Sequence, residues 1–154
     1  MNTSIKSAGT WQEMLYGALA ITGLTGAWAQ ALVYLHAGFL DGNIAFWKAA
    51  VTTPASLFIV VDIFVLAAAL FVWMFAEGRR LGISQAWLWG YFLGSVFVAI
   101  SFAFPLFLAH RQRLLRTEHP QQHAAPAGAD FVGIALAVLF ALCAVGYSFL
   151  HRPV

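Results

Sequence analysis

The chain has 154 residues, of which 62% are hydrophobic and only 9% are charged. A soluble domain usually carries about a quarter charged residues, so this composition excludes an ordinary water-soluble globular protein and indicates a protein embedded in lipid. The formal net charge is only +2, and no basic run is interleaved with aromatic residues, which argues against a nucleic-acid partner.

Four apolar windows are each long enough to cross a bilayer as a helix, which takes about 20 residues. They cover residues 14–40, 55–76, 86–109 and 131–150. A cleaved signal peptide is an alternative for the first window, since Ala27-Trp28-Ala29 fits a cleavage site, but the apolar run continues past it. The sequence therefore predicts an all-α, multi-pass protein of the bacterial inner membrane, with four transmembrane helices in a small bundle.

Polar stretches divide the chain into three predicted parts. Residues 1–112 form a three-helix membrane core, residues 113–129 an exposed polar linker broken by prolines, and residues 130–154 an additional C-terminal transmembrane helix. The second window begins with Thr53 and Pro54, a capping hydroxyl followed by a proline where its missing N–H costs nothing. Asp130 is the expected cap of the fourth helix.

Lysines and arginines in short loops normally set the orientation of a membrane protein. Four spans would place Lys6, Arg79, Arg80 and Arg152 on one side, and Lys48, Arg111, Arg113 and Arg116 on the other. The two sides tie, so these residues do not decide the orientation. We favour both termini in the cytoplasm.

Asp62 lies about two turns into the second window and precedes fourteen uncharged residues. A carboxylate at such a depth costs about 2.5–3.5 kcal/mol on the insertion scale, so it normally faces the bundle and has a partner. Ser101 lies at a matching depth in the third window, on a face shared with Gly90 and Gly94 that favours close helix packing. We predict that Asp62 meets Ser101, either as a structural hydrogen-bonding group or as a catalytic acid.

The second window ends in a charged turn that contains Glu77, Arg79 and Arg80. Glu77 lies fifteen residues beyond Asp62, which is about 22 Å along a helix, so the two acids do not form a catalytic pair. We expect Glu77 to pair with Arg79, Arg80 or Gln85. Two interpretations stay open: a structural turn, or a site for an anionic headgroup or ligand.

The remaining polar candidates are expected near the level of Asp62. Ser101, Arg111 and His36 join Glu77, Arg79 and Arg80 as candidate ligand- or lipid-binding residues. Haem ligation by two histidines needs imidazoles that face each other at one depth, and only His36 lies clearly within a window. Because Cys143 is the single cysteine, a multi-cysteine metal site is excluded. We expect no metal and no cofactor.

Two segments, PASLFIVVDIFVLAAALFVWMFAEGRRLGISQAWLW and SFAFPLFLAHRQ, carry a family resemblance. They resemble the small bacterial membrane proteins grouped as domain of unknown function 2834. The matching features are Asp62, residues 77–82, Trp87, residues 101–108 and Arg111. The resemblance covers residues 54–112 well and the first window in kind only. That family has no agreed activity, so the resemblance implies that Asp62 and the charged turn matter without naming a reaction.

Two classes of function fit these features. The first is a non-enzymatic membrane bundle that binds lipid, an isoprenoid-like ligand or a protein partner. The alternative is a membrane-embedded enzyme of the cyclase or isomerase type, in which Asp62 protonates an apolar isoprenoid-like substrate within aromatic walls. Proton or solute transport is a third class. No second acid lies at the depth of Asp62, which weakens every functional interpretation of this carboxylate.

Overall fold

The computed structural model describes residues 3–117, with side chains from residue 11 onward, and the isolated positions Ala135, Leu139, Leu142, Cys143, Gly146 and Leu150. Residues 3–117 form α1 (Thr3–Ala31), the 3-10 helix η1 (Leu32–Ala37), α2 (Phe39–Ala50), α3 (Pro54–Arg80), α4 (Gln85–Phe97) and α5 (Ile100–Thr117). The described part is therefore all-helical, as predicted.

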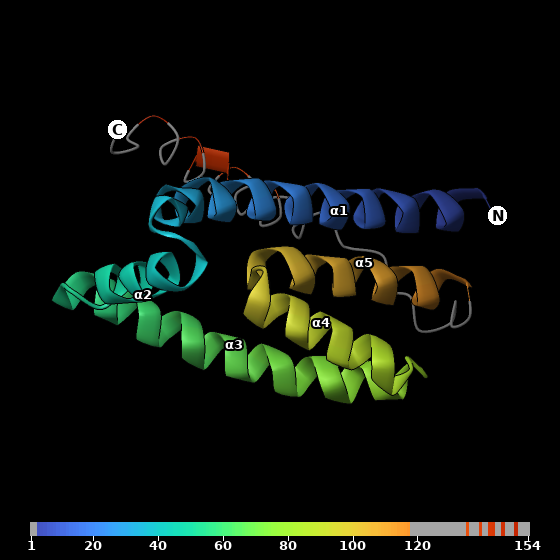
Figure 1. The fold of residues 1–154 in the computed structure, drawn as a ribbon. Helices are drawn as coiled ribbons and strands as arrows, with labels where there is room; N and C mark the ends of the chain where they lie inside the picture. The colour runs from blue at the N-terminus through green and yellow to red at the C-terminus, as the bar shows by residue number, and fades with distance from the viewer. Residues whose placement is uncertain are drawn as a thin grey trace.

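In Figure 1, α5 lies along α1, and α4 lies between α5 and α3. η1 and α2 connect α1 to α3 at one end of the molecule. α5 continues through residues 113–117, so the predicted start of the linker at residue 113 is wrong. The rest of the linker lies outside the described residues. The predicted fourth span and its expected cap, Asp130, also lie outside them, apart from the isolated positions.

α3 begins where its cap was predicted. The Thr53 hydroxyl accepts a hydrogen bond from the Ser56 backbone N–H at 3.1 Å, and the Ser56 hydroxyl accepts one from the Thr53 N–H at 3.2 Å. Pro54 occupies the first helical turn. This reciprocal pair satisfies two backbone donors that the helix start leaves without partners.

Two glycines close the turn after α3. Gly82 has φ of +71°, a left-handed conformation that favours glycine. Its N–H donates to the Arg79 carbonyl, and the Ile83 N–H donates to the Gly78 carbonyl, so these two carbonyls near the end of α3 are satisfied. A Cβ added to Gly78 would lie 2.3 Å from the Leu88 Cδ2 atom. The turn therefore returns α4 directly against α3.

The single third helix predicted over residues 86–109 is wrong. α4 ends at Phe97, and α5 begins at Ile100 and runs back along α4 (Figure 1). A Cβ on Gly94 would lie 3.3 Å from the Ala103 Cβ, across this hairpin. The predicted shared face of Gly90 and Gly94 therefore does not pack as one surface. Gly94 faces α5, whereas nothing lies within 4 Å of a Cβ at Gly90.

Contacts with α1 stabilise the hairpin. Pro105 has no N–H to donate to the Ser101 carbonyl, four residues earlier in α5. That carbonyl faces α1, where a Cβ at Gly23 would lie 2.3 Å from the Ser101 oxygen, and the Ser101 hydroxyl donates to the Gly23 carbonyl at 3.4 Å. At the tip, the Trp28 indole N–H donates to the Val98 carbonyl at 3.2 Å. Only glycine at position 23 allows this approach of the two backbones.

The buried core lies where α3, α4 and α5 meet. Its fully or nearly buried side chains are Met74, Leu81, Ile83, Leu88, Phe107 and Leu115. Away from this cluster, the surface of α3 is apolar and exposed, as at Phe58 (73%) and Val72 (74%). Two helical stretches, Trp11–Ala37 and Pro54–Arg80, are long and apolar enough to cross a membrane.

Candidate functional site

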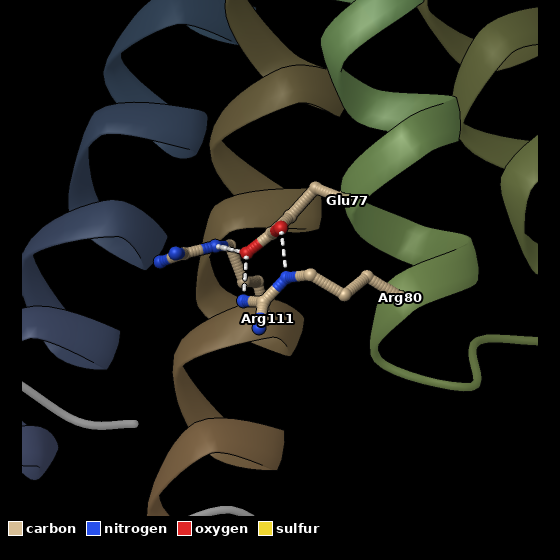
Figure 2. A network of polar contacts seen from close by, with 3 residues as sticks. All are labelled: Glu77, Arg80 and Arg111. Atoms are coloured by element: carbon tan, nitrogen blue, oxygen red, sulfur yellow. Dashed lines mark hydrogen bonds and ion pairs between the residues drawn. The ribbon is translucent and has the colours of Figure 1, made fainter.

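A charge network links the end of α3 to α5. Arg80 binds Glu77 through two hydrogen bonds of 2.7 Å, from Nε to Oε2 and from Nη2 to Oε1. Arg111 donates from Nε to Oε1 of the same carboxylate at 2.8 Å. Figure 2 shows the carboxylate held between the two guanidinium groups. Arg79, Arg80 and Gln85 were the predicted partners of Glu77, and the prediction is confirmed for Arg80.

The carboxylate of the network is the best shielded of its three groups. The Glu77 side chain is 10% exposed, against 47% for Arg80 and 27% for Arg111. Glu77 follows the uncharged run of α3 that ends at Ala76, so it lies at the polar end of the helix. The Arg80 hydrogen bonds, supported by Arg111 and opposed by burial, lower the pKa of Glu77 to about 2. Glu77 is therefore ionised at neutral pH and has no proton to deliver to a substrate.

Arg111 also contacts an aromatic ring. Its guanidinium carbon lies 5.6 Å from the centroid of the Trp73 ring, within the range of a cation–π contact. Trp73 in turn packs edge-on against the buried Phe107 at 5.8 Å. Arg111 is thus fixed both by a carboxylate and by an aromatic face, which anchors α5 to α3.

An aromatic group surrounds His110 beside this network. The Tyr91 hydroxyl lies 3.0 Å from His110 Nδ1 in a hydrogen bond between α4 and α5. The Trp87 ring packs against His110 at 5.9 Å and stacks with Tyr91 at 6.0 Å. These contacts hold the two arms of the hairpin together next to Arg111.

A second polar set joins α5 to the first half of α1. Arg116 binds Glu13 with a closest N···O distance of 2.9 Å, and Gln112 donates to Gln12. None of these residues is among the site candidates predicted from the sequence. The spacing of four between Gln112 and Arg116 places both on one face of a helix, but only the return of α5 along α1 gives that face its partners.

The predicted meeting of Asp62 with Ser101 is wrong. Asp62 is exposed and takes part in no hydrogen bond or ion pair within the described part of the chain. Ser101 bonds to Gly23 on α1 instead. The reason is the hairpin, because Ser101 follows a reversal of the chain that a continuous third helix would not have.

The other candidate residues divide into two groups. Arg111 joins Glu77, although four spans would have placed them at opposite faces of the membrane. Arg79 is exposed and forms no ion pair among the described residues. His36 is exposed on η1 and is not part of the network.

The fold and site define a class: a small helical protein with an exposed apolar helix and an arginine-rich polar end. The chain belongs to the family described as protein of unknown function DUF2834, whose model matches residues 15–113. This confirms the resemblance seen in the sequence and extends it to most of α1. No curated protein and no solved structure matches the chain.

Proposed function

We propose that this protein is a non-enzymatic, multi-pass protein of the bacterial inner membrane whose arginine-rich end binds anionic lipid headgroups. One observation carries the proposal: α3 is 27 residues long, apolar and exposed, and it ends in arginines. Its length is about 40 Å at 1.5 Å per residue, which exceeds the roughly 30 Å of a bilayer's hydrocarbon core.

The pattern of exposure on α3 favours lipid over a protein partner. Large apolar side chains are exposed at Phe58, Ile59, Val61, Ile63, Phe64, Val65 and Leu66. Residues at successive positions point in different directions around a helix, so one partner helix could not cover them all. Each such side chain gains about 1.5–3 kcal/mol on leaving water. Surrounding hydrocarbon can supply that gain to all of them, which outweighs the cost of about 2.5–3.5 kcal/mol for the exposed Asp62 in the same stretch.

The charges at the end of α3 favour an anionic headgroup. Arg80 and Arg111 share one carboxylate, Glu77, so this cluster keeps a net positive charge. Arg79 and Arg113 are also exposed, and neither forms an ion pair within the part of the chain that the structure describes. A cationic residue near an anionic membrane surface contributes about 1 kcal/mol of binding. These two arginines are therefore the proposed contacts to phosphate.

The alternative of an isoprenoid cyclase or isomerase has no support in the described residues. Asp62, its proposed acid, lies on the exposed surface of α3 without a hydrogen-bond partner there. A general acid needs a defined position relative to its substrate and an environment that tunes its pKa. The non-enzymatic function is for this reason preferred.

Lipid retention tests the proposal. Arg79→Gln/Arg113→Gln removes two exposed charges but leaves the Glu77 network in place. The protein is purified in mild detergent with mixed phosphatidylglycerol and phosphatidylcholine, and its affinity for each lipid is measured by native mass spectrometry. Losing about 2 kcal/mol predicts phosphatidylglycerol binding roughly 30-fold weaker. Lys48→Gln on α2 is the matched control and should retain phosphatidylglycerol like the wild type.

Three results would contradict the proposal. Equal retention of both lipids by the wild type would remove the anionic-headgroup site. Unchanged phosphatidylglycerol retention in the double variant would show that the two arginines do not form it. Recovery of the wild type in the soluble fraction, without detergent, would exclude the proposal that this is a membrane protein.

A further inference from the structure

We infer that α4 and α5 form a re-entrant hairpin, which enters the membrane from the arginine-rich end and returns to the same side. This rests on the proposed membrane insertion and adds a topology to it. The consequence is that most of the lysines and arginines lie on one side of the membrane, whereas a four-span arrangement divides them equally.

The first support is length. α4 has 13 residues and α5 has 18, which correspond to about 20 Å and about 27 Å. A hydrocarbon core of roughly 30 Å exceeds both, and the last part of α5, from Arg111 onward, carries three arginines. Neither helix crosses on its own, so the reversal after Phe97 lies within the membrane.

The second support is the pairing of the two arms. Tyr91 on α4 bonds to His110 on α5, while Gly94 faces Ala103. The positions rise along α4 as they fall along α5, which defines an antiparallel hairpin. The start of α4 and the end of α5 therefore lie at the same end of the molecule, as Figure 1 shows.

The third support is that α1 contacts the backbone at the break between α4 and α5. A helix break within lipid is tolerated only where protein satisfies or covers the freed polar groups. Here the Trp28 indole N–H donates to the Val98 carbonyl, and α1 packs closely against Ser101 just beyond the break. The side chain of Phe97 at the tip is 76% exposed, which suits hydrocarbon and not water.

The hairpin resolves the tie in basic residues. The three arginines of α5 now lie at the same end as Arg79 and Arg80. Lys6 belongs to the same end, because it lies near the start of α1, and the first half of α1 contacts the end of α5. In the described chain, Lys48 on α2 is the one lysine or arginine at the other end. The positive-inside rule then places the arginine-rich end in the cytoplasm. Residue 117 therefore lies on the same side as the start of α1.

Single cysteines in the full chain test this topology. In a Cys143→Ser background, Ser84→Cys and Thr117→Cys report the two ends of the hairpin, Asn43→Cys the opposite end, and Phe97→Cys the tip. Each variant is labelled with a membrane-impermeant maleimide in sealed vesicles of known orientation, before and after detergent. Gln85→Cys repeats the Ser84 probe in case that variant folds poorly.

The expected result is labelling of positions 84 and 117 from the cytoplasmic side, position 43 from the other side, and position 97 only after detergent. Labelling of 84 and 117 from opposite sides would overturn the hairpin while leaving membrane insertion intact. Labelling of both from the non-cytoplasmic side would overturn the assigned orientation. Labelling of all four positions without detergent, in a protein found in the soluble fraction, would instead overturn the proposed membrane function and this inference with it.

Discussion

Replacing Glu77 with glutamine removes the one negative charge that two arginines share. The glutamine keeps the size of the side chain and one acceptor oxygen, so the perturbation is largely electrostatic. Arg80 is 47% exposed and can be rehydrated, so its ion pair contributes little to stability. Arg111 is only 27% exposed, and a more buried charge loses more when its partner is removed.

Together these contributions predict that Glu77→Gln lowers the free energy of unfolding by about 2 kcal/mol, between the values for exposed and for fully buried pairs. The assay is reversible unfolding in detergent micelles, followed by tryptophan fluorescence. Arg79→Gln is the matched control at the same end, and it should change stability by about 0.5 kcal/mol or less. In a double-mutant cycle, Glu77→Gln and Arg111→Gln should be coupled, because the two side chains are in direct contact.

A Glu77→Gln variant as stable as Arg79→Gln would refute the reasoning, because it would show that the network contributes no net stability. A coupling energy near zero would have a narrower meaning. Glu77 would then stabilise the turn through Arg80 alone, and the link to α5 would be incidental.

Two further predictions concern the same bundle. Gly23→Ala should separate α1 from α5 and cost about 1–3 kcal/mol as an overpacked contact, whereas Gly17→Ala, with open space around it, should not; equal unfolding free energies for both variants would contradict this packing. The folded-state pKa of Glu77, about 2, lies below its ordinary value of 4.5, so its contribution to stability is complete above about pH 4.5 and is lost as the pH falls toward 2. Wild-type stability should therefore fall across that window by more than the stability of Glu77→Gln does, and parallel pH profiles would argue against this linkage.

Local chemistry made several features predictable from the sequence. Thr53 and Pro54 define the start of α3 because capping depends on neighbouring residues alone. The pairing of Glu77 with Arg80 was predictable for the same reason, since residues three apart on a helix lie side by side. Gly82 also marked its turn, because a left-handed residue after a helix is usually glycine.

The reversal between Phe97 and Ile100 could not be predicted in the same way. No glycine or proline stands at the break, and the proline of this region, Pro105, lies inside α5. The apolar run is continuous, so its composition fits one helix as well as two. What favours the break is tertiary, with the Trp28 indole bonding to Val98 from α1. Arg111 and Ser101 both follow that reversal, so their positions and partners were predicted wrongly.

The separation of contacts along the chain gives α1 a distinct place in folding. Glu77 and Arg111 are 34 residues apart, and Tyr91 and His110 only 19, whereas Glu13 and Arg116 are separated by 103. Closing a longer loop costs more entropy before any contact forms. α3, α4 and α5 can therefore assemble first, and α1 docks onto a surface they have already built. The tip of the hairpin is completed only then, so amide-exchange labelling during refolding should show protection around Met74 before protection of the α1 interface.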